Sequence, residues 1–287
     1  MKLAFAKYHG AGNDFIMVDN RADDRRIHDA LSQETIANLC RRAHGIGADG
    51  LIQVIKHDGE IPYTMGYFNA DGTPAEMCGN GLRCTLQFLA DLGEPVREMA
   101  EVGIMTGSGP IKVRFANEEL IQVSMPIPSF TPRDAHIVAK EEVIHQQFEV
   151  PGLGDPVTGT AVGVGNPHFV MYNNDMWEGD DVHAIGSRLM VHRDLFPEGV
   201  NVGFARKEAP DTLALVVYER GCGPTLACGS GAIAAVAAGI REGKFEQEQA
   251  VKVRMPGGDL KVTIGPDWTY AILEGTATRV FEGSVEI

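Results

Sequence analysis

The chain carries one short phrase twice, Met-Cys-Gly-Asn-Gly at 77–81 and Ala-Cys-Gly-Ser-Gly at 227–231. Each phrase follows a strand-like run and opens a helix-like run, so each places a cysteine just before a helix N-terminus. The free N–H groups and the macrodipole of a helix N-terminus favour a thiolate over a thiol. One such cysteine is a candidate nucleophile, whereas two in equivalent positions indicate a pair that faces one site.

The duplication extends beyond the two cysteine phrases. Gly-Ala-Gly-Asn at 10–13 resembles Gly-Val-Gly-Asn at 163–166, and Ile-Lys-Val at 111–113 corresponds to Leu-Lys-Val at 260–262. All these pairs are separated by about 150 residues, which predicts two copies of one unit, each within the usual size of a domain. Because two copies are too few for a solenoid, we predict two pseudo-symmetric lobes.

Length, composition and charge narrow the class of protein. With 287 residues, 44% of them hydrophobic, the chain can bury two substantial cores. No apolar stretch is long enough to span a bilayer, and the N-terminus at 1–10 lacks the apolar core of a signal peptide. A net charge of −14 argues against nucleic acid or an anionic membrane as partner. Five cysteines, an odd number in a large chain, favour a reducing cytoplasm over a secreted disulfide framework.

Hydrophobic alternation predicts mostly short strands in hairpin-like succession, with few helices. In the first copy we expect strands at 3–7, 15–19, 51–55, 63–69, 111–115 and 120–125, and helices at 32–42, capped by Ser32, and at 79–92. In the second copy we expect strands near 160–172, at 200–205 and at 213–219, helices near 181–191 and from Gly229, and closing strands at 250–255, 259–264, 269–274 and 278–287. Pro-Ile-Pro at 126–128 interrupts any strand ladder and marks the boundary between the copies.

Gly-Ile-Gly-Ala-Asp-Gly at 45–50 matches the dinucleotide-binding fingerprint G-x-G-x-x-G. It follows a helical-looking segment rather than a strand, and a strand-like run at 51–55 stands where the fingerprint requires a helix. The context therefore argues against a nucleotide site at this motif.

Four of the cysteines form two C-x5-C pairs, Cys78 with Cys84 and Cys222 with Cys228, which raises the question of a zinc site. Zinc sites usually have two to four residues between the paired cysteines, and Cys84 would point from a helix into packing. We therefore expect no metal site, and we interpret Cys40 and Cys84 as buried small hydrophobes.

Two helix-capping thiols without a visible cofactor motif suit one kind of chemistry. Inversion at a carbon needs a base on one face and an acid on the other, and two equivalent cysteines provide one thiolate and one thiol. The charge that develops would spread into an adjacent carboxylate, held by N–H groups at the two helix ends. These groups belong to Gly79, Asn80, Gly229 and Ser230. The sequence thus points to a two-base racemase or epimerase that acts on an α-amino acid without a cofactor.

Three further polar residues have both a structural and a functional interpretation. His168 follows Asn166-Pro167 within the repeated Gly-x-Gly-Asn context, so a site role stands beside that of a core or turn histidine. Glu219 and Arg220 end the strand-like run before the second cysteine, where a site role is favoured over a solvated edge pair.

Several segments, taken together, are highly specific. They are His-Gly-Ala-Gly-Asn-Asp-Phe at 9–15, Phe-Asn-Ala-Asp-Gly at 68–72, Glu-Met-Cys-Gly-Asn-Gly at 76–81, Gly-Asn-Pro-His at 165–168, Asn-Val-Gly at 201–203, Tyr-Glu-Arg-Gly at 218–221 and Ala-Cys-Gly-Ser-Gly at 227–231. On these segments the chain resembles the diaminopimelate epimerase family over essentially its full length. Proline racemases, which share the fold, typically carry Cys-Gly-His at the first thiol, where this chain has Cys-Gly-Asn at 78–80.

The resemblance implies a reaction and a role for each candidate residue. Cys78 and Cys228 would be the acid–base pair that epimerises LL-2,6-diaminopimelate to the meso form, without cofactor or metal, in lysine and peptidoglycan precursor biosynthesis. The other residues would bind parts of the substrate or tune the thiols. They are those that bind the carboxylate at the reacting centre (Gly79, Asn80, Gly229, Ser230), the reacting amine (Asn13, Glu219) and the distal amino-acid end (Asn69, Asn166, Asn201, Arg220), and those that tune the thiols (His168, Glu219).

The resemblance also implies an α/β (α+β) fold of two similar lobes, each a curved, largely antiparallel sheet around a central helix. The N-terminal lobe would span 1–126 with Cys78, completed by a returning strand at 276–287, and the C-terminal lobe 127–275 with Cys228. It further implies a cytoplasmic homodimer that takes a small amino acid as substrate, with neither nucleic acid nor membrane as partner.

Three positions depart from the family pattern. Gly50 stands where many members have Gln, so one polar contact to the substrate is absent or made otherwise. Pro224 stands where Glu is common, which puts the loop conformation before Cys228 in question. Phe281 stands where some relatives have a Tyr linked to dimerisation, which weakens the expectation of a homodimer.

Two other functions stay open from the sequence. The nearer is a racemase of another amino acid, such as histidine, on the same fold. Loss of the residues assigned to the distal end would favour it, and none is lost. The more distant is a non-catalytic, two-lobe amino-acid-binding protein in which the cysteines merely pack.

Overall fold

The computed structural model describes residues 1–173, 175, 177 and 179–287, and the chain divides into two compact units. Unit 1 comprises Met1–Ser124 and Glu274–Ile287, and unit 2 comprises Met125–Leu273. Each unit therefore contains one of the two cysteine phrases. In the described part of the chain, no helix has the length and apolar character that a membrane crossing requires.

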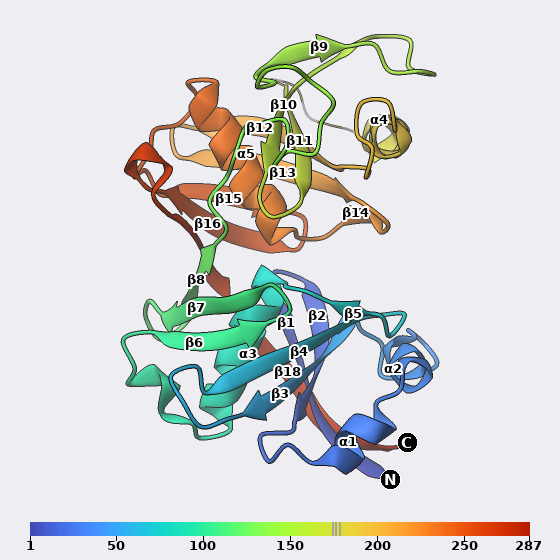
Figure 1. The fold of residues 1–287 in the computed structure, drawn as a ribbon, viewed down its shortest axis with the longest axis vertical. Coiled ribbons are helices and arrows are strands. Elements are labelled where there is room, and N and C mark those ends of the chain that lie inside the picture. The colour runs from blue at the N-terminus through green and yellow to red at the C-terminus, as the bar shows by residue number, and fades with distance from the viewer. Residues whose placement is uncertain (174, 176, 178) are drawn as a thin grey trace. The chain divides into compact units, whose positions relative to one another are not determined.

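Unit 1 is drawn mainly in blue to green in Figure 1, with its last strand in red. Its strands are β1 (Lys2–Gly10), β2 (Asn13–Asp19), β3 (Gly50–Lys56), β4 (Tyr63–Asn69), β5 (Pro74–Ala75), β6 (Val102–Thr106), β7 (Gly109–Phe115), β8 (Leu120–Met125) and β18 (Thr278–Glu286). Its helices are α1 (Arg25–Ala30), α2 (Gln33–Cys40), α3 (Gly79–Asp91) and the 3-10 turn η1 (Pro95–Arg97).

The sheet of unit 1 encloses one central helix. β1 pairs antiparallel with β2 and β18, β2 runs parallel to β3, and β3 pairs antiparallel with β4. β4 runs parallel to β6, which continues through the antiparallel strands β7 and β8. α3 packs on strands of this sheet, including β1, β2 and β7 (Figure 1). Pairing with β18 brings the C-terminus beside the N-terminus.

Unit 2 contains the yellow to orange elements of Figure 1. Its strands are β9 (Gln146–Phe148), β10 (Val157–Gly163), β11 (Pro167–Tyr172), β12 (Asn201–Ala209), β13 (Thr212–Glu219), β14 (Gly223–Thr225), β15 (Val251–Met255) and β16 (Gly258–Ile264). Its helices are α4 (Gly179–Val191), α5 (Gly229–Arg241) and the 3-10 turn η2 (Pro266–Trp268), and β17 (Ala271–Thr276) leads from unit 2 into unit 1.

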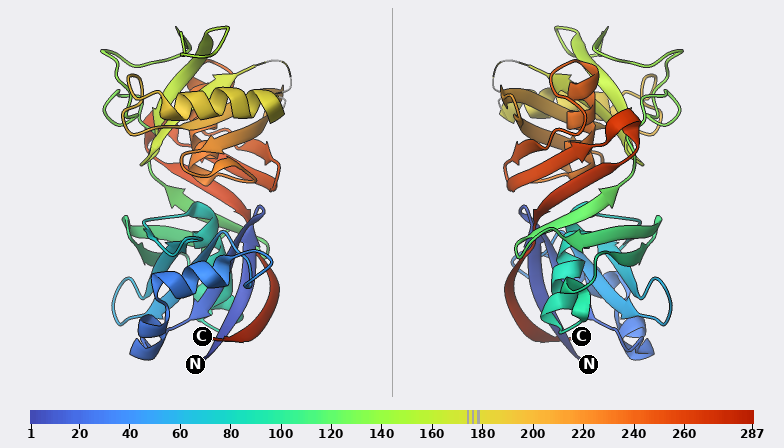
Figure 2. Two further views of the ribbon diagram at one scale, coloured as in Figure 1. Left: turned by 90° about the vertical axis from the view of Figure 1, so that its right-hand side faces the viewer. Right: turned by 90° about the vertical axis from the view of Figure 1, so that its left-hand side faces the viewer.

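Unit 2 repeats the strand order of unit 1. β11 runs parallel to β12 as β2 does to β3, β12 and β13 form a hairpin as β3 and β4 do, and β13 runs parallel to β15 as β4 does to β6. α5 takes the place of α3 and packs on β10–β13 and β16. α4 packs separately on β12, β13 and β14, and Figure 2 shows it as the yellow helix.

Local sequence explains why the two central helices form. Leu82, Leu86 and Leu89 recur at helical spacing in α3 and are fully buried. α5 instead has alanine at half of its buried positions, which lets the surrounding strands approach its backbone closely. α3 ends at Asp91, just before Gly93, whose φ of +82° is a left-handed conformation that glycine adopts without steric cost.

The structure confirms the predicted central helices, the helix near 181–191 and the Ser32 cap. It differs from the prediction elsewhere, and the short strands β5, β9 and β14 were not predicted. The helix expected over 32–42 ends at Cys40, because the Arg41 backbone turns to an extended ψ of 117°. α1 was not predicted, since none of its residues is buried and it has no apolar periodicity. β6 was not predicted either, because Gly103 interrupts its alternation.

Candidate functional site

Each repeated cysteine is the N-cap of the central helix of its unit. Cys78 precedes α3 with φ −144° and ψ 119°, and Cys228 precedes α5 with φ −132° and ψ 111°. In both units the sulfur accepts a hydrogen bond at 3.4 Å from the backbone N–H three residues later, that of Gly81 or Gly231. The predicted position of both thiols at helix N-termini is therefore confirmed.

The second glycine of each phrase is required by close packing. A Cβ at Gly81 would lie 2.9 Å from Cδ1 of Ile52 on β3. A Cβ at Gly231 would lie 2.9 Å from Cγ2 of Val217 on β13 and 3.2 Å from the Cys228 sulfur. A side chain at either position would push the helix end away from the strand that it packs on, and with it the thiol.

The thiol of unit 1 is partly exposed and lies against two asparagine side chains. The Cys78 Sγ lies 3.6 Å from Oδ1 of Asn13, at the start of β2. The same oxygen accepts a hydrogen bond at 3.2 Å from Nδ2 of Asn80, whose side chain is 2% exposed. The structure therefore brings together three predicted site residues, Cys78, Asn13 and Asn80.

Two charged residues that the sequence analysis did not select flank this cluster. Asp49 Oδ2 accepts from Asn13 Nδ2 at 2.8 Å, and Arg83 Nη2 donates to Asn80 Oδ1 at 2.8 Å. Arg83 is fully buried, and its Nε donates to the carbonyl oxygen of Thr276 at 3.1 Å. Burial lowers the pKa of the Arg83 guanidinium, an effect that electrostatic interaction with Cys78 opposes. The sequence signal that could have identified Arg83 is its position on the apolar face of a predicted helix.

Asn69 lies at the C-terminal end of β4 rather than in the hydrogen-bonded cluster around Cys78. Its side chain is exposed, and its Nδ2 donates to Oγ1 of Thr73 at 3.0 Å in the turn that leads to β5. In unit 2 the equivalent strand end holds Glu219. Phe68 pairs with Pro74 of β5 as Tyr218 pairs with Pro224 of β14, and Asn69 and Glu219 are the next residues of their strands.

The thiol of unit 2 is more deeply buried than that of unit 1. Cys228 is 4% exposed, and its sulfur lies 3.6 Å from the Ser230 hydroxyl. Burial and the neighbouring Glu219 carboxylate raise the pKa of the Cys228 thiol well above its ordinary value, while Ser230 and the Gly231 N–H oppose this shift. The hydroxyl of Thr225, which the sequence analysis did not select, donates to Glu219. Cys228, Ser230 and Glu219 thus form one cluster.

A second group of predicted residues lies at the start of β11 and β12 and at the end of β13. The parallel register sets His168 opposite Asn201, whose Nδ2 donates to the carbonyl oxygen of Pro167 at 3.0 Å. Asn201 Oδ1 accepts from the Arg220 backbone N–H at 2.9 Å. The Arg220 guanidinium itself is at the surface, where it donates to the Glu198 carbonyl at 3.1 Å.

His168 is a neutral, buried imidazole. It is 1% exposed, and its Nε2 lies 2.9 Å from Oδ1 of Asn166. Burial, with a smaller contribution from the Arg220 cation, lowers the pKa of His168 to about 3. A neutral imidazole with Nε2 protonated donates to an amide oxygen, so His168 orients the Asn166 side chain.

The structure gives a physical reason for two of the three departures from the family pattern. A Cβ at Gly50 would lie 2.4 Å from the Phe68 carbonyl oxygen, so this backbone leaves no room for glutamine. Pro224 on β14 lies opposite Tyr218, as Pro74 on β5 lies opposite Phe68, so it repeats the arrangement of the first copy. Phe281 on β18 is 46% exposed and packs edge-to-face on Phe5 at 5.9 Å between ring centroids.

The Gly-rich motif at 45–50 has no helix after it, as the sequence context indicated. Gly45 and Gly47 fold back on the end of α2, donating their N–H groups to the carbonyls of Arg41 and Leu39 at 2.8 and 3.0 Å, and β3 follows directly. Cys40 and Cys84 are buried, as predicted. Among residues 1–173, 175, 177 and 179–287, no three His, Cys, Asp or Glu side chains form a group that could hold a metal ion.

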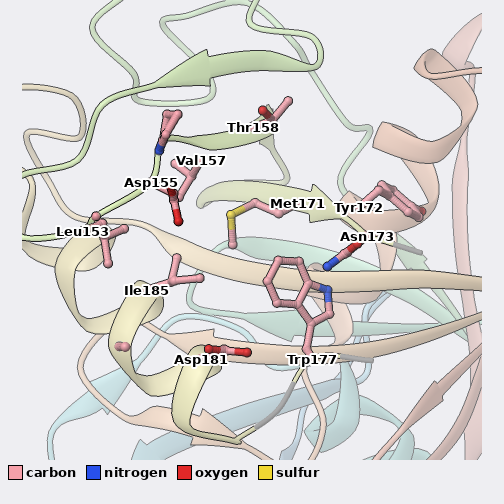
Figure 3. Close-up of a pocket in the computed structure, with 13 residues that line it drawn as sticks. Leu153, Asp155, Val157, Thr158, Met171, Tyr172, Asn173, Trp177, Asp181 and Ile185 are labelled. Atoms are coloured by element: carbon pink, nitrogen blue, oxygen red, sulfur yellow. The ribbon is translucent and has the colours of Figure 1, made fainter. Parts of the chain in front are cut away.

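Figure 3 shows a cavity of about 340 Å³ in unit 2. It is bounded by α4, by β10 and β11, and by the segment before β10, and its lining includes Asp155, Met171, Trp177, Asp181 and Ile185. None of the residues predicted for the site lines it.

Comparison with known proteins identifies relatives over the full chain. The family model described as diaminopimelate epimerase matches residues 5–131 and 160–280. A diaminopimelate epimerase from Acaryochloris marina is 38% identical over 290 residues, covering 100% of this chain and 99% of the relative. One from Methanothermobacter thermautotrophicus is 35% identical, covering 98% of each.

Solved structures share the fold at low sequence identity. A phenazine biosynthesis protein of the PhzF family from Bacillus anthracis has a TM-score of 0.69 and 17% identity and covers 100% of both chains. A probable proline racemase from Agrobacterium radiobacter K84 has a TM-score of 0.66 and 14% identity, covering 99% of this chain and 93% of that one. These likenesses confirm the predicted fold class.

Proposed function

Because the chain belongs to the diaminopimelate epimerase family, we propose that Cys78 and Cys228 are the acid–base pair with which it epimerises diaminopimelate. The activity is that of an isomerase, and lysine biosynthesis is the route it serves. The observation that carries the proposal is the duplicated N-cap: each unit presents one thiol, ahead of one helix, beside free backbone N–H groups.

The reaction needs one thiolate and one thiol on opposite faces of the α-carbon. The thiolate removes the α-proton, and the electron pair left on carbon spreads into the adjacent carboxylate. The other thiol then delivers its proton to the opposite face and becomes the thiolate, so the configuration is inverted. Running the reaction backwards exchanges the two roles.

The backbone N–H groups at the starts of α3 and α5 would stabilise the charge on that carboxylate. They belong to Gly79, Asn80, Gly229 and Ser230. A helix N-terminus favours a bound anion, and preorganised N–H donors strengthen as negative charge grows. The second glycine of each phrase supports this role indirectly, since it holds the helix end close to the strand behind it.

Each thiol lies beside an acceptor. Cys78 faces Oδ1 of Asn13, and the Glu219 carboxylate acts on Cys228. Both acceptors are the residues we assign to the reacting amine. An ammonium group bound to Asn13 and Glu219 would take over these contacts, and one thiol could then ionise next to the α-proton.

The distal amino acid of the substrate would bind Asn69, Asn166, Asn201 and Arg220. Arg220 supplies a planar guanidinium for the second carboxylate, and the Asn201 side chain fixes its backbone. His168 would orient Asn166 through the hydrogen bond between their side chains. Recognition of a second amino-acid end is what separates this substrate from histidine or proline.

The test is epimerisation of LL-diaminopimelate compared with L-histidine and L-proline, in deuterated water, followed by NMR. We expect deuterium at Cα and inversion with diaminopimelate alone. Inversion of histidine with no reaction of diaminopimelate would favour a racemase for another amino acid. Binding of diaminopimelate without deuterium incorporation would favour a non-catalytic binding protein.

We also propose a homodimer that acts in the cytoplasm. Five cysteines, an odd number, suit a reducing compartment, and Val280 and Phe281 expose apolar surface on β18. Light scattering of the wild type and of Phe281→Asp tests the assembly. A monomeric wild type at micromolar concentration would contradict it.

A further inference from the structure

One hydrogen-bond chain in unit 1 begins at a cation and ends at an anion. Arg83 Nη2 donates to Asn80 Oδ1 at 2.8 Å, and Asn80 Nδ2 donates to Asn13 Oδ1 at 3.2 Å. Asn13 Nδ2 then donates to Asp49 Oδ2 at 2.8 Å. Two side-chain amides are thus held between one charged donor and one charged acceptor.

The charged ends determine which way both amides point. An arginine can only donate, so Asn80 must turn its oxygen to Arg83 and its nitrogen to Asn13. An ionised aspartate can only accept, so Asn13 must turn its nitrogen to Asp49. The oxygen of Asn13 is therefore left facing the Cys78 sulfur at 3.6 Å. A flipped Asn13 amide would set donor against donor at Asn80 and acceptor against acceptor at Asp49.

Asp49 is itself fixed by the backbone. Its Oδ2 also accepts the Asp14 N–H at 3.1 Å, and its own N–H donates to the Asp14 carbonyl at 2.9 Å. The Gly-rich segment at 45–50 makes this placement, because it folds back on the end of α2 with Gly47 at a φ of +79°. The motif that resembles a dinucleotide fingerprint thus places the Asp49 carboxylate next to the Asn13 side chain.

Unit 2 lacks both ends of the chain. Alignment of the two cysteine phrases puts Ile233 at the position of Arg83. The register of β11 with β12, compared with that of β2 with β3, puts Val200 at the position of Asp49. The hydrogen-bond chain therefore belongs to unit 1, and its two charged ends have no charged counterparts at the equivalent positions of unit 2.

We propose that Asp49 and Arg83 are positioning residues that lock the Asn13 carbonyl toward Cys78 and toward the ammonium group of the substrate. The ammonium role rests on the proposed function, whereas the orientation of the amide does not. With the amide locked, a carbonyl oxygen faces the Cys78 sulfur, and such an oxygen favours the thiol over the thiolate. The reacting amine then meets an acceptor instead of a competing N–H donor.

Other ionisable groups surround this hydrogen-bond chain. The Asp49 variants compared below retain all of them, and Arg42 is changed only in the control. Arg83 and Cys84 of α3 interact electrostatically with Cys78. Lys7 of β1 and Arg42 pair with Asp14 at 2.7 Å each, and Arg42 also pairs with Oδ1 of Asp49 at 2.7 Å. Arg42 thus contacts the carboxylate oxygen that Asn13 does not use.

The experiment compares Asp49→Ala with Asp49→Asn, and uses Arg42→Gln as a control. Both Asp49 changes remove the charge, but only alanine removes the acceptor, since the Asp14 N–H holds the oxygen of an introduced amide toward Asn13. Arg42→Gln removes the ion pair and leaves the chain intact. The side chain of Asp49 is 41% exposed, so these variants should fold. The measurement is alkylation of Cys78 by iodoacetamide against pH, without substrate, quantified by peptide mass spectrometry with Cys228 as internal reference.

We expect the midpoint of Cys78 alkylation to fall by about one pH unit in Asp49→Ala, a tenfold change in the ionisation equilibrium. Asp49→Asn and Arg42→Gln should stay close to wild type, and Cys228 should not change. Epimerisation should show a KM raised about tenfold in Asp49→Ala and restored in Asp49→Asn, because the acceptor rather than the charge is needed.

An equal shift in both Asp49 variants would mean that charge alone acts, and it would overturn the proposal, as would no shift in Asp49→Ala. If the alkylation shift is found but wild-type protein does not epimerise diaminopimelate, the locked amide stands and the proposed function fails. If epimerisation is normal and the alkylation midpoint does not move, only the positioning role is lost.

Discussion

The surroundings of the two cysteines share a backbone frame and differ in the side chains that fill it. Both have a cysteine N-cap, a sulfur that accepts an N–H at 3.4 Å, and a glycine pressed against a strand. Around Cys78 the surroundings are charged, with Arg83 and Asp49 at the two ends of a hydrogen-bond chain. Around Cys228 the helix is rich in alanine, and the groups that act on the thiol are the Ser230 hydroxyl and the Glu219 carboxylate.

This comparison distinguishes the features that inversion of the α-carbon requires from the features that binding of the substrate requires. A proton must be exchanged on both faces of one carbon, so both copies keep the thiol and the helix N-terminus. The proposed contacts to the amine and to the distal end of the substrate use different residue types in the two copies, so these positions are free to diverge. The predictions below test that division.

The largest effect should come from removing one thiol. In Cys78→Ala, Cys228 can still reach the α-proton of one epimer, but no acid waits on the other face. Epimerisation should fall by about 10²–10⁴-fold or more, while solvent exchange survives preferentially for one epimer. Cys228→Ala should show the opposite preference. The measurement is deuterium wash-in to LL- and meso-diaminopimelate by NMR, and equal exchange of both epimers by both variants would mean that one base serves both faces.

A smaller effect is expected for Arg220→Lys, which tests the distal end in unit 2. The planar fork becomes a point charge, so kcat/KM for diaminopimelate should fall by about 10²-fold, mainly through KM. Arg193→Lys is the matched control, since Arg193 also donates to a backbone carbonyl in this region, that of Pro197 at 3.2 Å. Unchanged steady-state kinetics in Arg220→Lys would remove Arg220 from the site.

The two units should also differ in their response to acid. The pKa of His168 is about 3 in the folded protein against 6.5 unfolded, so only the unfolded chain takes up its proton between these values. Stability of unit 2 should therefore fall as pH drops below 6.5, by about 2 kcal/mol at pH 5. His168→Gln should remove this slope in urea titrations at pH 5 and 7.

In unit 1 the acid-sensitive group is Asp14, which takes up its proton at lower pH than His168 would in the unfolded chain. Hydrogen bonds from Arg42 and Lys7 outweigh burial and lower the pKa of Asp14 to about 2, from an ordinary value of 3.8. Its contribution is complete above 3.8 and is lost as pH falls toward 2. Hydrogen exchange at pH 5 should thus show loosening of unit 2 while unit 1 is unchanged, and the reverse order would contradict the contrast.

The smallest effect is expected at Pro224, where the two copies agree. Because Pro224 repeats the position of Pro74, Pro224→Glu should change activity less than twofold and stability by less than about 0.5 kcal/mol. Pro74→Ala gives the matching change in unit 1. A large loss of activity in Pro224→Glu alone would show that this position distinguishes the surroundings of the two cysteines after all.

Local signals in the sequence predicted the central helices, their cysteine caps and most strands. The phrase around each cysteine combines a cap, a glycine and an apolar helix, and none of these depends on distant residues. The parallel pairings could not be predicted in this way, because β2 with β3 and β11 with β12 join strands that have a helix between them.

The two ends of the Asn13 chain were missed for different reasons. Arg83 is a charged residue in a helix, which usually lies at the surface, and one of its partners, Thr276, lies far away in sequence. Asp49 lies in a motif whose best-known use is nucleotide binding. Only the folded arrangement of β2, α3 and the segment at 45–50 reveals what both residues do.

The return of the last strand has a consequence for synthesis of the protein. Unit 2 is one continuous run, Met125–Leu273, so it can fold as soon as that run has left the ribosome. Unit 1 must wait for Glu274–Ile287, because β18 pairs with β1 and the Thr276 carbonyl receives the Arg83 guanidinium. Until Glu274–Ile287 have been added, the Cys78 half of the molecule therefore lacks a strand, and the Arg83 Nε lacks the Thr276 carbonyl. A released chain that ends before Glu274 would contain the whole of unit 2 and lack β18 of unit 1.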